Sequence, residues 1–135
     1  MANAVARDYL DFDTRLDALC AAMLAGDPHV KATAEQLMQS SIGDFWLFRE
    51  AFGAIAGTSD LASLEIRAEE TPNSGYVFYA LGVIKLCEGE LIEAKRLLDK
   101  CKNDPNYMSA YPLYAKAILA KMERDPDWMS SFLTR

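Results

Sequence analysis

The residues best suited to chemistry in this chain are a single histidine and three cysteines. They are His29, Cys20, Cys87 and Cys101. A nucleophilic site would need His29 beside a serine or cysteine, and nothing in the sequence places one there. A zinc site would need ligands paired at short spacing, which this set lacks. We therefore predict a protein with no catalytic residue, no metal and no cofactor, and not an enzyme.

Each of these residues has a simpler structural explanation. His29 falls in the first turn of a predicted helix, where a solvated ring is typical. The cysteines lie within apolar helical stripes and lack the spacing of a disulfide framework, so we expect them to be reduced. The glutamates at Glu65, Glu69 and Glu70 most simply form a solvated face. No glycine-rich phosphate loop is present.

Length and charge narrow the class of protein. The chain has 135 residues, of which 51% are hydrophobic and 25% charged, a composition typical of one globular domain. The formal net charge of −6 and the absence of a basic stripe argue against a nucleic-acid partner. No apolar run reaches the length of a membrane span, and no signal sequence is visible, so we expect a soluble, cytoplasmic protein without membrane insertion.

The segment from Phe78 to Pro105 has the most regular pattern. Gly82 lies inside a predicted helix, where glycine costs about 1 kcal/mol in propensity, so a neighbouring helix carrying Ala94 is expected to approach it closely. Gly89 supplies the left-handed position that ends this first helix. A second amphipathic helix follows and stops at Pro105.

This spacing resembles the tetratricopeptide repeat, a helical hairpin used in protein binding. The residues that carry the resemblance are Phe78, Leu81, Gly82, Gly89, Ala94, Leu98 and Pro105. Sliding the chain back by one repeat places Gly57 on Gly89, Ala62 on Ala94 and Ile66 on Leu98. Sliding it forward places Pro72 on Pro105. Glu50 and Lys85 depart from the pattern, so the middle unit matches best.

The resemblance implies an all-α fold in which antiparallel helical hairpins stack as a short solenoid with capping helices at both ends. We predict one domain over residues 1–135. It comprises an N-terminal helical hairpin at 1–41, the repeats at 42–124 and a C-terminal capping helix at 125–135.

The two ends of the chain have apolar patterns of their own. An apolar seam runs along the first predicted helix from Val5 through Tyr9 to Met23, and Gly26 ends that helix. The C-terminal segment from Trp128 to Leu133 is short and strongly apolar. Both segments are expected to cover the ends of the repeats. The alternative is that one of them forms a dimer interface.

In the tetratricopeptide family, the first helix of each unit lines a concave groove. The matching positions here are Leu47, Ala51, Ile55, Tyr76, Tyr79, Val83, Leu86, Lys116 and Leu119, with Cys87, Pro112 and Ala120 beside them. Tyr76 and Tyr79 share one helix face. The alternative is that several of these side chains belong to the core between repeats.

These features predict a non-enzymatic protein-binding module. It would hold an amphipathic helix or an extended apolar segment of another protein in its groove. In size and architecture the chain resembles the helical-repeat chaperones of bacterial type III secretion, which implies an adaptor or secretion-type chaperone. The alternative function is a self-associating structural protein, for example a homodimer.

Overall fold

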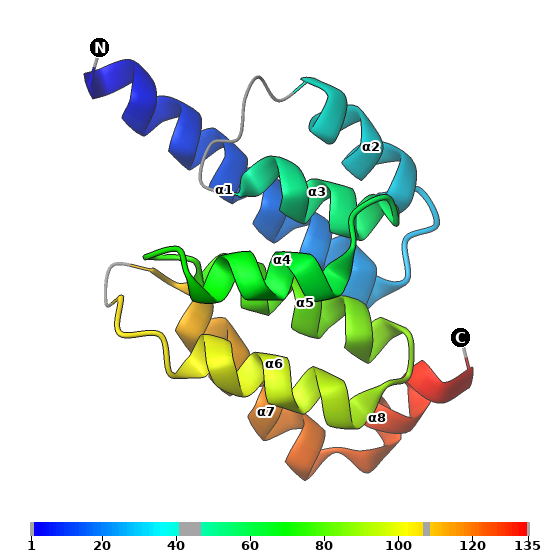
Figure 1. Ribbon diagram of the computed structural model, residues 1–135. Coiled ribbons are helices and arrows are strands. Elements are labelled where there is room, and N and C mark those ends of the chain that lie inside the picture. The colour runs from blue at the N-terminus through cyan, green and yellow to red at the C-terminus, as the bar shows by residue number, and fades with distance from the viewer. Residues whose placement is uncertain (1, 41–46, 107–108, 135) are drawn as a thin grey trace. The chain divides into compact units, whose positions relative to one another are not determined.

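The structure is a computed structural model that describes residues 2–40, 47–106 and 109–134 (Figure 1). These residues form eight α-helices and one 3₁₀ turn, with no strand among them. The α-helices are α1 (Ala2–Ala25), α2 (Val30–Ser40), α3 (Phe48–Ala56), α4 (Leu61–Glu69), α5 (Gly75–Cys87), α6 (Leu91–Lys102), α7 (Tyr111–Arg124) and α8 (Pro126–Ser131). The chain divides into two compact units, Met1–Leu64 and Glu65–Arg135.

Unit 1 is built on three helices. Gly26, with φ of 79°, ends α1 and turns the chain toward α2, as the sequence predicts. Helices α2 and α3 pack together, and α1 contacts both. The core contains an aromatic cluster in which the Phe12 ring lies 5.8 Å from Phe48 and 6.2 Å from Phe52, measured between centroids. Such tilted and edge-on pairs add to the burial of the rings themselves.

The N-terminal seam is described only in part. Val5 and Tyr9 lie outside the residues whose side chains the structure describes. Farther along α1, Leu16 and Leu19 are buried, as expected for the apolar side of a packed helix. Leu16 and Leu19 of the seam therefore belong to the core, whereas Met23 is half-buried.

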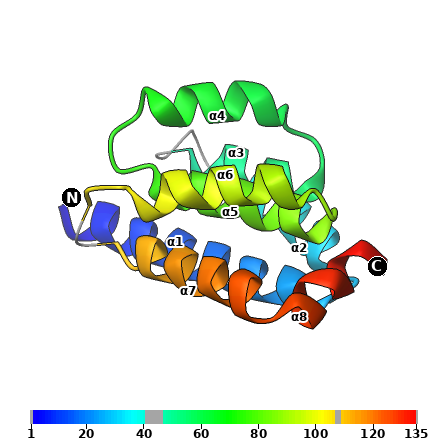
Figure 2. The ribbon, with the colours of Figure 1, turned by 90° about the horizontal axis from the view of Figure 1, so that it is seen from below.

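Unit 2 centres on the antiparallel hairpin of α5 and α6, with α7 packed beside α6 (Figure 2). Gly89, at φ of 80°, forms the left-handed end of α5, which confirms the sequence prediction. A Cβ at Gly82 would lie 2.8 Å from two side-chain carbons of Leu98 and 3.4 Å from its backbone nitrogen. The predicted close approach therefore exists, although its partner is Leu98 rather than Ala94.

The C-terminus folds onto unit 2. Asp125 begins α8 by accepting a 3.0 Å hydrogen bond from the Trp128 amide. The Trp128 and Phe132 rings meet edge to face at 5.0 Å, and Phe132 is buried. The following turn, η1 (Phe132–Thr134), brings Leu133 against Gly89. Phe132 is thus packed, Trp128 and Met129 are half-buried, and Leu133 stays 60% exposed.

The sequence alignment predicted the wrong buried face for α4. Ala62 is exposed and Ile66 is 57% exposed, whereas Leu64 and Ala68 are buried. The reason lies in the preceding turn. Helix α6 begins two residues after Gly89, but α4 begins four residues after Gly57, so matching the two glycines assigns α4 the opposite face.

The all-α class is confirmed for the described residues. The solenoid arrangement stays a prediction, as does the single domain with boundaries at 41 and 124. The division between the two compact units falls within α4, between Leu64 and Glu65. Across the part of the chain that the structure describes, no helix is both long enough and apolar enough to cross a bilayer.

Candidate functional site

The predicted groove residues are mostly interior. Seven of the nine are buried: Leu47, Ala51, Ile55, Tyr76, Tyr79, Val83 and Leu86. The Tyr79 ring lies 5.3 Å from Tyr111 and 6.0 Å from Tyr114, so the tyrosine face of α5 meets α7. Within unit 2, this burial favours the alternative in which the tyrosines are core. Their role in partner binding stays a prediction.

The remaining two predicted residues lie in a surface groove. Lys116 and Leu119 are on α7, in a hollow between α6, α7 and α8 that we call the α6–α7 groove. Met122 is buried at its base, and Met129 of α8 also lines it. Methionine side chains adapt to differently shaped partners, so this groove has a binding chemistry that the tyrosine face lacks.

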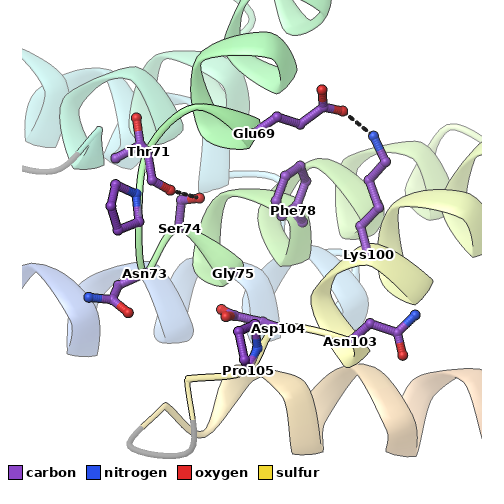
Figure 3. Close-up of a pocket in the computed structure, with 11 residues that line it drawn as sticks. Glu69, Thr71, Asn73, Ser74, Gly75, Phe78, Lys100, Asn103, Asp104 and Pro105 are labelled. Carbon is purple, nitrogen blue, oxygen red and sulfur yellow. Dashed lines mark hydrogen bonds and ion pairs between the residues drawn. The ribbon is translucent and has the colours of Figure 1, made fainter.

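A second hollow, which we call the Phe78 pocket, lies where the loop before α5 faces the end of α6 (Figure 3). Its volume is about 600 Å³. The Phe78 ring is at its base, with Pro72 and Pro105 among the lining residues. Seven of the eleven lining residues are polar or charged, but the surface that the lining exposes to the pocket is mainly apolar, as is usual for binding pockets.

The loop before α5 is held by local hydrogen bonds. The buried Ser74 hydroxyl lies 2.5 Å from the Ala68 carbonyl oxygen and 2.7 Å from that of Thr71. Asn73 adopts a left-handed backbone with φ of 58°, which asparagine tolerates better than most residues. These contacts hold in place the loop before α5, which forms one wall of the Phe78 pocket, and they do not require a ligand.

Asp104 joins the two sides of the Phe78 pocket. Its Oδ1 accepts a 3.1 Å hydrogen bond from the Asn106 amide. Its Oδ2 is buried against Gly75, and a Cβ at position 75 would overlap that oxygen. Glycine is therefore required sterically for the carboxylate to sit beside the first residue of α5, where the helix dipole favours negative charge.

An ion-pair network borders the Phe78 pocket. Glu65 forms ion pairs with Arg96 at 2.7 Å and with Lys100 at 2.6 Å, and Lys100 also pairs with Glu69. Hydrogen bonding from Arg96 is the largest cause that lowers the Glu65 pKa to about 2. The hydrogen bonds that Lys100 donates to Glu65 and Glu69 raise the pKa of Lys100, whose ammonium lies 5.6 Å from the Phe78 ring centroid.

This network predicts a pH dependence of stability. The Glu65 pKa is about 2 in the folded protein and near 4.5 otherwise, so the unfolded chain binds more protons between these values. The stabilisation that the ionised Glu65 carboxylate gives the folded protein is complete above about pH 4.5 and is lost as pH falls through 2. Because solvent screens the 42% exposed Arg96, we expect a loss of about 1–2 kcal/mol. Urea titrations across this range measure it.

Glu65→Gln should remove this part of the pH dependence. The control is Glu70→Gln, at an exposed carboxylate with no ion pair among the described residues. If the free energy of unfolding of Glu65→Gln falls with pH as steeply as that of the native chain, the network does not contribute to the pH dependence.

The residues with catalytic potential are dispersed. His29 is exposed in the turn just before α2, whereas Cys20 and Cys101 are buried. Burial raises the pKa of the Cys101 thiol to about 12, which keeps it protonated at neutral pH. Within the described residues, no group of three His, Cys, Asp or Glu side chains is arranged to hold a metal ion.

Sequence reasoning missed the Phe78 pocket, although a signal was present. The repeat alignment placed Pro72 on Pro105, and both prolines line this pocket. Equivalent turns of neighbouring repeats come together when repeats stack, so these turns could have predicted a shared hollow.

Comparison of the chain with protein-family models found no match. Searches among curated proteins and among solved structures likewise found no similar protein. The fold and the two hollows of unit 2 are therefore the basis for a functional proposal.

Proposed function

We propose that this protein is a non-enzymatic, cytoplasmic binding module that holds an apolar segment of a partner protein. The observation that supports this proposal most strongly is the Phe78 pocket, a hollow of about 600 Å³ with a mainly apolar surface and a preformed wall. Its size suits one or two large apolar side chains of a partner. An adaptor or a secretion-type chaperone fits this function.

Polar groups at the Phe78 pocket match a polypeptide ligand. Asn73 and Asn103 line it, and their side-chain amides have no hydrogen-bond partner among the described residues. Each amide offers both a donor and an acceptor, which is the complement of a peptide unit. An extended segment could therefore place its backbone across the asparagines and an apolar side chain over Phe78.

Asn103→Arg is expected to block this binding. Asn103 is the C-cap of α6, where a cation is favoured by the helix dipole, so the protein should stay folded. The longer side chain would occupy the Phe78 pocket, and we expect partner recovery to fall at least about tenfold, because a filled pocket removes the central anchor. Quantitative affinity purification from the native host measures this change.

The control is Glu35→Arg, an exposed position on α2 in unit 1. A stoichiometric partner should accompany the native chain and this control. If the partner is recovered equally with Asn103→Arg, the Phe78 pocket is not the binding surface. If no partner is found and light scattering shows a stable oligomer, the alternative self-associating function replaces the proposal.

A further inference from the structure

The α6–α7 groove carries an unusual charge for this protein. The chain has a formal net charge of −6, yet three lysines line this groove. They are Lys95 and Lys102 of α6 and Lys116 of α7. Two acidic residues, Asp99 and Glu123, also line it. Lys102 pairs with Asp99 at 3.4 Å, whereas Lys95 and Lys116 make no ion pair within the described residues.

Helix geometry places the free lysines on both walls. Lys95, Asp99 and Lys102 recur at helical spacing and so share one face of α6. Lys116 shares a face of α7 with Leu119 and Glu123 by the same rule. Figure 2 shows that α6 and α7 run antiparallel. Lys95 lies in the first half of α6 and Lys116 in the first half of α7, so the two lysines come from opposite walls of the groove.

The floor between these lysines is apolar. Leu119 and Met129 are half-buried, and Met122 is only 2% exposed. Pro126 begins α8 and lines the same hollow, whose volume is about 600 Å³. Glu123 also has no ion pair among the described residues, so the unpaired charges of the groove are two lysines and one glutamate. A ligand that fits this net positive charge presents apolar side chains to the floor and negative charge to Lys95 and Lys116.

We infer that the α6–α7 groove docks an acidic amphipathic helix of a partner protein. Leucine or phenylalanine side chains of that helix pack on Leu119 and Met129, and its glutamates pair with Lys95 and Lys116. This inference deepens the proposed protein-binding function by assigning a second surface and the chemistry of its ligand. A basic helix is disfavoured, because it would meet both unpaired lysines.

The test uses a defined synthetic probe. The probe is a fluorescent peptide of about four helical turns, with leucines on one face and glutamates on the other. Binding is followed by fluorescence anisotropy at low and at physiological salt. We expect saturable binding that weakens as salt rises, because surface charge pairs are screened. A matched peptide with lysines in place of the glutamates should not bind.

Charge reversal localises the interaction. Lys95→Glu with Lys116→Glu should weaken binding of the acidic peptide at least about tenfold and allow the lysine peptide to bind. The control is Lys31→Glu with Arg49→Glu, which changes the net charge equally at exposed positions of unit 1. This control should leave the affinity within about twofold. Circular dichroism must show that both double variants stay helical.

Three results would overturn the inference. They are no binding of the acidic peptide, equal binding of the two peptides, or unchanged affinity after reversal at Lys95 and Lys116. A concentration-dependent dimer that this reversal dissociates would assign the α6–α7 groove to a second copy of the chain. Failure here leaves the proposed function intact, because that function is tested separately at Asn103.

Discussion

Replacing Gly82 with leucine is expected to lower the free energy of unfolding by about 3 kcal/mol, at the upper end of the usual cost of overpacking. Even the first carbon of a side chain would lie 2.8 Å from Leu98, which is fully buried and cannot move into solvent. Because α5 and α6 form the central hairpin of unit 2, the hairpin would have to separate. Urea unfolding followed by circular dichroism measures the change.

Two further variants calibrate this result. Gly82→Ala gains about 1 kcal/mol in helix propensity, which offsets part of its clash, so its loss should be smaller. Ala117→Leu introduces the same side chain at an exposed site on α7 and should be nearly neutral. If Gly82→Leu unfolds at the same midpoint as the native chain, the close approach to Leu98 does not exist.

Phe52→Ala is expected to destabilise unit 1 by about 3–5 kcal/mol, because it deletes a fully buried ring. Phe52 lies 6.2 Å from Phe12 and 6.4 Å from Phe48 between ring centroids, so its loss leaves a cavity at the centre of the cluster. Amide hydrogen exchange in α2 and α3 should accelerate, since both helices pack within this unit.

Phe52→Leu retains most of the buried volume and should cost less than about 1.5 kcal/mol. The comparison separates the loss of volume from the loss of the aromatic ring. Exchange rates in α3 that are unchanged by Phe52→Ala would place the core of unit 1 elsewhere.

Local features of the fold could be predicted from single residues. Gly26, Gly57 and Gly89 each end a helix in the left-handed conformation, where other residues are strained. Gly82 correctly indicated a close helix approach, because an interior glycine is costly unless packing requires it. The neighbouring residue was misassigned by one helical turn, since spacing within a helix does not fix its axial position against another helix.

The candidate site could be predicted only in part. The pattern correctly indicated that Tyr76 and Tyr79 share a face, yet it could not distinguish a face that is open from one that α7 covers. Lys116 and Leu119 do line a groove, but its other wall comes from α6 and α8. The Phe78 pocket joins two loops that lie far apart in the sequence. The alignment of Pro72 with Pro105 paired these loops, but such a pairing does not by itself show that a hollow lies between them.

The most direct test of the protein-binding function is site-specific photo-crosslinking in living cells of the native host. A benzophenone amino acid replaces the exposed Pro105 beside the Phe78 pocket or, as the control, Glu35 on the exposed surface of α2. We predict one discrete crosslinked species at position 105, containing a second protein, and none at position 35. The absence of any crosslink at 105, or the same species at both positions, would contradict the proposal.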